Sequence, residues 1–75
     1  MITNGIEKKL LRKLSEVLLM REEEIKNFLK RETGENPEVI FRAVVPRLLE
    51  RGLVRYVYTG DACYAITQTG LKEAE

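Results

Sequence analysis

The chain has 75 residues, of which 44% are hydrophobic, and its 13 basic and 12 acidic side chains leave a formal net charge of +1. This length allows one small domain, residues 1–75, and the near-neutral charge counts against strong non-specific DNA binding, because dedicated nucleic-acid-binding domains are usually more basic. The single cysteine, Cys63, and the lack of histidine exclude an internal disulfide and a structural zinc site, so no metal and no cofactor are expected.

Residues 4–19 are predicted to form the first helix. Asn4 can cap it, with Glu7 three residues later at the spacing of a capping box. Apolar positions at helical spacing predict a buried stripe of Ile6, Leu10, Leu14, Val17 and Leu18. Another face carries a basic cluster of Lys8, Lys9, Arg12 and Lys13. This cluster is either solvated surface or a contact for phosphates or an acidic partner.

After a short apolar link that can supply one or two residues of strand, residues 21–32 are predicted to form a second helix. The three glutamates of residues 22–24 stand where the helix dipole favours them. They indicate a helix start rather than a metal site, because consecutive side chains do not converge on one face. Ile25, Phe28 and Leu29 form the expected buried side. Gly34 follows in a turn and is free to take a positive φ.

Residues 36–51 are predicted to form the third helix. Asn36 can cap it, Pro37 suits the first helical position, and Gly52 is a C-terminal stop. The expected buried stripe comprises Phe41, Val44, Val45 and Leu48. At about 100° per residue, the opposite face presents Val39, Ala43, Pro46 and Glu50, flanked by Arg42 and Arg47. Pro46 lies on the solvent side, where water can serve the freed carbonyl, so a bend is expected rather than a break.

Residues 53–59 and 62–67 are predicted to form two strands, joined by a two-residue type II′ turn at Gly60-Asp61. That turn would place Val57 opposite Tyr64. The core face would then carry Val57, Tyr64 and Ile66, and the other face Tyr56, Tyr58 and Cys63. Residues 71–75 can form at most one turn of helix.

Three helices followed by a hairpin resemble the winged-helix DNA-binding domains of many bacterial and archaeal transcription regulators. The residues of the likeness are Leu48–Val54 (LLERGLV), similar to the family's leucine-rich helix end followed by Gly-Leu-Val, and Tyr64–Gly70 (YAITQTG), similar to the closure of the wing. The likeness covers nearly the whole chain. It implies an α+β winged helix, with a three-helix helix-turn-helix core followed by a two-stranded β-hairpin wing.

The resemblance also implies binding to double-stranded DNA in transcription regulation, with the third helix in the major groove and the hairpin tip near the flanking minor groove or backbone. The residues implicated are Glu38, Val39, Arg42, Ala43 and Arg47 on the helix, Lys30, Arg31 and Thr33 around the preceding turn, and Thr59 and Gly60 at the tip. Arginines can contact guanine or phosphate, and small apolar groups can meet thymine methyls.

Other features favour a protein contact. Pro46, Tyr56 and Tyr58, together with Val39 and Ala43, are apolar groups that we expect to be exposed, and such patches more often mark protein interfaces. The alternative function is therefore a winged-helix protein–protein interaction module of a larger replication, transcription or sorting assembly. A homodimer through the first helix or the tyrosine face also stays open.

No hydrophobic run approaches the roughly 18 residues of a membrane span, and the N-terminus lacks a signal-peptide pattern, so a cytoplasmic protein without membrane contact is expected. With no histidine, Gly-rich phosphate loop or nucleophile–base pair, we do not expect an enzyme. So small a core also leaves little room for a small-molecule effector.

Overall fold

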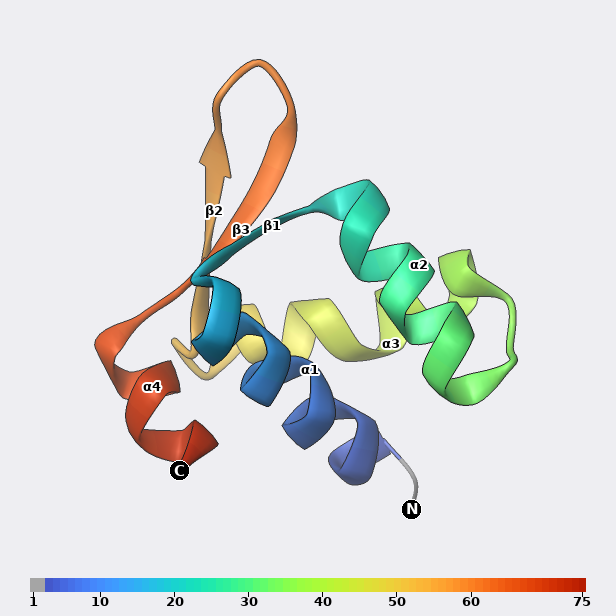
Figure 1. Cartoon of the computed structure of the whole chain (residues 1–75), viewed down its shortest axis with the longest axis horizontal. Helices are drawn as coiled ribbons and strands as arrows, with labels where there is room; N and C mark the ends of the chain where they lie inside the picture. Colours follow the sequence, from blue (N-terminus) through green and yellow to red (C-terminus); the bar gives the residue numbers. More distant parts are fainter. Residues whose placement is uncertain (1–2) are drawn as a thin grey trace.

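The computed structural model describes residues 3–75, with their side chains from residue 5 onward. The elements in chain order are α1 (Thr3–Val17), β1 (Leu19–Arg21), α2 (Glu22–Thr33), α3 (Pro37–Glu50), β2 (Val54–Tyr58), β3 (Ala62–Ile66) and α4 (Gln68–Ala74). The described part of the chain is therefore α+β, with four helices and a three-stranded antiparallel sheet of order β1-β3-β2. The β2–β3 hairpin projects away from the helices (Figure 1).

The predicted limits of α2 and α3 are confirmed to within one residue. The side chain of Asn36 caps α3, because its Oδ1 accepts the N–H groups of Glu38 at 2.9 Å and Val39 at 3.4 Å. Gly52 follows the helix with a φ of 72°, a conformation that glycine adopts at little cost. The helix continues through Pro46, which is exposed, so the predicted absence of a break is confirmed.

The first helix ends earlier than predicted, at Val17, because the next residues leave it to form a strand. Leu18 takes a φ of 74°, and β1 then pairs with β3. Val17 and Leu18 are consequently exposed, contrary to the predicted buried stripe, and Leu11 is buried in their place. The predicted cap at Asn4 lies outside the side chains that the structure describes.

The register of the hairpin differs from the prediction by one residue. The loop is Thr59–Asp61, with Gly60 at its centre in a φ of 94°, so Tyr56 faces Tyr64 and Val57 faces Cys63. A one-residue shift moves every side chain of β2 to the other face of the sheet. The predicted faces were therefore wrong for β2: Tyr56 and Tyr58 share a face with Tyr64, and Val57 lies with Cys63 on the opposite face.

Packing against the helices explains this register. The Tyr64 ring meets Phe41 of α3 edge-on, with centroids 5.8 Å apart, so the Tyr64 face of the sheet is the one that faces the helices. Val54, at the start of β2, is buried on this same face. The observed register thus buries Val54 beside α3, whereas the predicted one would have turned Val57 inward.

The core lies between the helices and this face of the sheet, and every helix from α1 to α3 contributes to it. Its buried members are Ile6, Leu10, Leu11, Leu14, Met20, Ile25, Phe28, Leu29, Val44, Val45, Leu48, Leu53, Val54 and Tyr64. The predicted buried sides of α2 and α3 are confirmed, except that Phe41 is only half-buried. Packing of apolar side chains from distant segments is the main term that holds the elements together.

The last element, α4, is longer than the single turn predicted. Thr67 caps it, because its Oγ1 accepts the N–H of Gly70 at 3.0 Å and donates to the carbonyl of Gly52 at 2.6 Å. Gly70 is buried directly against the Leu53 carbonyl, with no space for a Cβ atom. The Thr-x-x-Gly sequence thus serves to seat α4 on the segment that follows α3.

Candidate nucleic-acid interface

The turn between α2 and α3 is held by local hydrogen bonds. Gly34 adopts a φ of 72° and donates its N–H to the Lys30 carbonyl at 2.7 Å, which ends α2. The Thr33 hydroxyl donates to the Leu29 carbonyl at 2.8 Å and accepts the N–H of Glu35 at 3.1 Å. Thr33, a predicted phosphate contact, is therefore engaged within the turn. The arrangement sets the start of α3 against α2.

The outer face of α3, defined here by Val39, Arg42, Ala43 and Pro46, is uncovered. All four residues are exposed, and Val39 leaves 62% of its surface accessible to solvent. Within the part of the chain that the structure describes, no carboxylate lies at ion-pair distance from Arg42. This face therefore offers a guanidinium that is in no ion pair and lies between small apolar groups, with Glu38 one turn away, where the charge of Arg42 helps to lower the pKa of that carboxyl.

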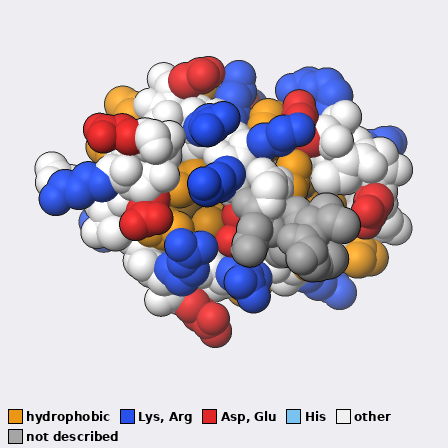
Figure 2. All heavy atoms as spheres, turned by 90° about the horizontal axis from the view of Figure 1, so that it is seen from below, with side chains coloured by type: hydrophobic (Ala, Val, Ile, Leu, Met, Phe, Trp, Pro, Cys, Tyr) orange, Lys and Arg blue, Asp and Glu red, His pale blue; other side chains and the backbone are white. Residues whose placement is uncertain are grey.

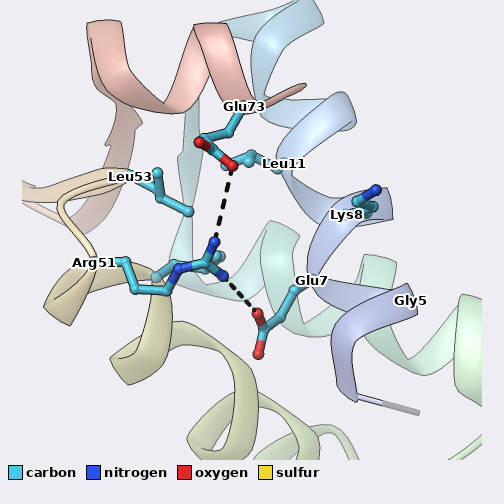
Figure 3. Close-up of a pocket in the computed structure, with 8 residues that line it drawn as sticks. Gly5, Glu7, Lys8, Leu11, Arg51, Leu53 and Glu73 are labelled. Atoms are coloured by element: carbon cyan, nitrogen blue, oxygen red, sulfur yellow. Dashed lines mark hydrogen bonds and ion pairs between the residues drawn. The ribbon is translucent and has the colours of Figure 1, made fainter. Parts of the chain in front are cut away.

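Arg47, predicted to flank this face, has a side chain that is 55% exposed and turns toward α1, which it binds. Its Nε donates to Oε2 of Glu7 at 2.7 Å, and Arg51 approaches Oε1 of the same carboxylate at 3.3 Å. Arg51 also lies 3.9 Å from Glu73 of α4, so one guanidinium bridges two acids (Figure 3). The side chain of Glu7 is only 4% exposed. These contacts fasten α3 to α1 and α4.

Glu38 is compensated by a cation from α2. Nζ of Lys26 lies 2.8 Å from Glu38 and 2.9 Å from Glu22, and it stands 5.3 Å from the centre of the Phe41 ring. The hydrogen bond from Lys26 lowers the pKa of Glu38 below its ordinary value. The same bond, with that to Glu22, raises the pKa of Lys26. The acidic start of α3 therefore repels a phosphate less than its sequence suggests.

The remaining predicted contacts lie at two ends of the site. Lys30 and Arg31 are exposed on the last turn of α2. Thr59 and Gly60 are exposed in the hairpin loop, where Asp61 lies 3.9 Å from a guanidinium nitrogen of Arg21. The charge of Asp61 at the tip is thus partly balanced by Arg21 of β1, as the charge of Glu38 is by Lys26 of α2.

The two exposed tyrosines of β2 occupy the face of the sheet that also meets α3. Tyr56 is 51% exposed and its ring packs edge-on against Tyr64, with centroids 5.4 Å apart, while Tyr58 is 69% exposed nearer the tip. The predicted exposure of both residues is confirmed, although their face was assigned wrongly. Tyr64, packed between Tyr56 and Phe41, links the hairpin to α3.

The basic cluster of α1 lies beside the end of α2 and not on α3, and Lys13 lines the same hollow as Arg31. On the face seen from below in Figure 1, Lys and Arg side chains are spread over the surface with acidic side chains among them (Figure 2). Lys9 of this cluster lies 3.4 Å from Glu32 at the end of α2. The mixed signs are typical of a solvated surface.

The Glu7–Arg47–Arg51 network is the feature that sequence reasoning missed. A signal existed, because Glu7 stands within the apolar spacing of α1, three residues before Leu10 and seven before Leu14. An acid in that stripe must find a cation if it is buried. Arg47 and Arg51, four residues apart on one face of a helix, were suitable partners.

None of the described helices has the length and apolar character that crossing a bilayer requires. Comparison with protein-family models, with curated proteins and with solved structures gives no significant match to the chain. The function is therefore argued from the geometry of the site.

Proposed function

We propose that this chain is a winged-helix protein that binds double-stranded DNA, with α3 in the major groove, and that it acts as a transcription regulator. The observation that carries the proposal is the uncovered outer face of α3, with Arg42 free between Val39 and Ala43. The order of elements supports it, since two helices joined by a short turn precede a hairpin that completes a β1-β3-β2 sheet.

The outer face of α3 has the chemistry to read bases. The Arg42 guanidinium can donate two hydrogen bonds to guanine O6 and N7, a contact worth about 1–3 kcal/mol of discrimination. The apolar groups of Val39 and Ala43 fit the C5-methyl of thymine. Small side chains beside the arginine also allow the helix to approach the groove closely.

Few residues near this face can contact phosphates, so we expect the affinity for DNA to depend only weakly on salt concentration. Lys30 and Arg31 at the end of α2 can bind the backbone, while Arg42 is engaged with a base. Two neutralised phosphates correspond to a slope of about −2 in a plot of log K against log salt concentration. Glu38 and Asp61 oppose binding less than free acids would, because Lys26 and Arg21 compensate them.

The proposal is tested with the full chain and a pool of random duplexes, from which bound sequences are selected and then titrated at about 50 and 200 mM salt. We expect Arg42→Ala to weaken binding to the selected duplex by about tenfold or more. Arg12→Ala on α1 removes the same charge from another helix and should leave affinity nearly unchanged. Equal losses in both variants, or no binding of the unchanged chain at the lower salt, would contradict the proposal.

A second candidate is a protein–protein interaction module of a replication, transcription or sorting assembly. It is favoured by one specific observation, the high exposure of Val39, Tyr56 and Tyr58. Apolar and aromatic side chains of this kind are enriched at protein interfaces. If the titration finds no DNA binding, and Tyr58→Ala abolishes binding to a partner protein, this candidate replaces the first.

A further inference from the structure

The first two turns of α3 carry an acid and a base that can neutralise each other. Glu38 and Arg42 are four residues apart on the helix, and both side chains are exposed. Side chains at this spacing are neighbours, and an acid that precedes a base by four residues stands in the favourable order for an ion pair. The charge of Arg42 already helps to lower the pKa of Glu38. The sequence of α3 alone would therefore allow Glu38 to occupy the guanidinium of the outer face.

Lys26 of α2 competes with Arg42 for this carboxylate. Its Nζ donates a hydrogen bond of 2.8 Å to Oε2 of Glu38. The same nitrogen lies 2.9 Å from Glu22, one turn earlier on α2, so Lys26 joins the starts of two helices. The side chain of Lys26 is only 21% exposed, whereas that of Glu38 is 58% exposed. A partly shielded cation attracts a carboxylate more strongly than a solvated one, because water screens it less.

Lys26 is also the better-ordered of the two cations. Its Nζ stands 5.3 Å from the centre of the Phe41 ring, within the range of a cation–π contact. The Phe41 ring is itself fixed edge-on against Tyr64. An ion pair between two solvated side chains gains little, since both must become ordered to form it, and Arg42 offers Glu38 only a pair of this kind. Lys26 is therefore the favoured partner of Glu38.

We propose that Lys26 is a positioning residue for the outer face of α3: by holding Glu38 toward α2, it keeps the Arg42 guanidinium available to a partner. Without Lys26, Glu38 turns to Arg42, and the outer face presents a neutral pair. That the partner is duplex DNA rests on the proposed function, whereas the competition of the two cations for one carboxylate does not depend on it.

The expected effect of losing Lys26 on DNA binding has two parts. An Arg42 that is paired with Glu38 must leave that pair before it donates to a guanine, and an exposed pair at this spacing lowers the affinity by up to about twofold. The carboxylate of Glu38, no longer balanced by Lys26, also repels the phosphates of the duplex. Together we expect a loss of about threefold or more.

The competition is tested first without DNA, by an NMR titration of the Glu38 carboxyl in the full chain. In the unchanged chain, Arg42→Ala should raise the pKa of Glu38 only slightly, because Arg42 is the weaker of its two cations. In a Lys26→Met background the same substitution should raise that pKa by a larger amount, because Arg42 has become the partner. An equal response in the two backgrounds overturns the proposal.

The second measurement titrates the selected duplex with the unchanged chain, Lys26→Met, Glu38→Gln and the double variant. We expect Lys26→Met to weaken binding by about threefold or more on its own, but by less than about twofold where Glu38 is already glutamine. A Lys26 that bound a phosphate directly would cost the same in both backgrounds, and that result contradicts the proposal.

Two further variants supply controls. Lys26→Arg keeps a cation beside Glu38 and should retain the affinity, while Lys8→Met removes the same charge from an exposed position on α1 and should leave binding unchanged. Circular dichroism shows whether each variant is folded. If no form binds DNA but the pKa of Glu38 responds as expected, the role of Lys26 stands and the proposed function fails. If DNA binds with equal losses in both backgrounds, the proposed function stands and this inference fails.

Discussion

Both sides of α3 carry arginines, but those on one side form ion pairs and the one on the other side does not. On the side toward α1 and α4, Arg47 and Arg51 converge on the nearly buried carboxylate of Glu7. On the outer side, Arg42 lies in solvent with no carboxylate of the described residues at ion-pair distance, although its charge helps to lower the pKa of Glu38 one turn before it. The difference shows that an arginine on this helix is structural or available according to what lies across from it.

The ion pairs of Arg47 and Arg51, on what we call the fastened side of α3, also hold the outer face of the helix in place. Glu7 ties the second half of α3 to α1, and Arg51 extends the link to Glu73 of α4. An interface helix needs such support, because contacts with a partner are lost if the helix shifts by about an ångström. Substitutions on each side of α3 test whether the two sides differ in this way.

The largest effect is expected from Gly70→Ala, which acts on the fastened side. The added Cβ would collide with the Leu53 carbonyl and with Ile66, so α4 must move away from the segment after α3. We expect a loss of about 3 kcal/mol in the free energy of unfolding, measured by urea denaturation. Gly5→Ala is the control, because nothing lies within 4 Å of a Cβ at that position. Similar losses in both variants would show that α4 is not seated by Gly70.

A smaller loss of folding stability than that of Gly70→Ala is expected for Arg47→Ala, with Arg42→Ala as its control. Arg47→Ala leaves Glu7, a nearly buried acid, without its closest donor and should lower the free energy of unfolding by about 2 kcal/mol. Arg42→Ala removes an exposed side chain and should change it by no more than about 0.5 kcal/mol. Thermal and urea unfolding of the two variants measure the difference. If Arg47→Ala and Arg42→Ala were equally stable, Arg47 would be no more important to the fold than Arg42.

The smallest change in folding stability is expected from the ion pair between Lys26 of α2 and Glu38 at the start of α3. The pKa of Glu38 is lowered, so its contribution to stability is present above its ordinary value of 4.5 and is lost as the pH falls through the depressed value. The pKa of Lys26 is raised, so its contribution is present below 10.5 and is lost as the pH rises above that value.

The matching experiment follows the unfolding midpoint of the unchanged chain and of Lys26→Met from pH 7 down to acid. We expect the unchanged chain to be the more stable one at neutral pH and the gap to narrow as Glu38 takes up a proton. A gap that stays constant below pH 4.5 would mean that Lys26 stabilises the fold through packing on Phe41 instead.

Several elements could be predicted because their signals are local. The start of α3 is encoded by Asn36 and Pro37, and its end by Gly52, all of which act through their own backbone geometry or caps. The exposed position of Val39 and Ala43 followed from helical spacing alone. These parts of the candidate site were therefore visible without coordinates.

Other parts depended on contacts between distant segments. The hairpin register was missed because a two-residue and a three-residue loop both suit Gly60, and only the burial of Val54 beside α3 distinguishes them. The end of α1 was missed because Leu18 adopts a positive φ that its side chain does not favour, held there by pairing of β1 with β3. No local pattern reports such a constraint.

The sequence by itself determined where the three main helices and the hairpin lie and which face of α3 points outward, since capping, turn chemistry and periodicity act over a few residues. Only the tertiary structure decided which arginines form ion pairs, which face of β2 meets the helices, and that the link after α1 forms a three-residue strand paired with β3 and the C-terminal residues a seven-residue helix. Those outcomes depend on charge pairing, strand register and close packing between segments far apart in the sequence, such as Glu7 and Arg51, which are 44 residues apart.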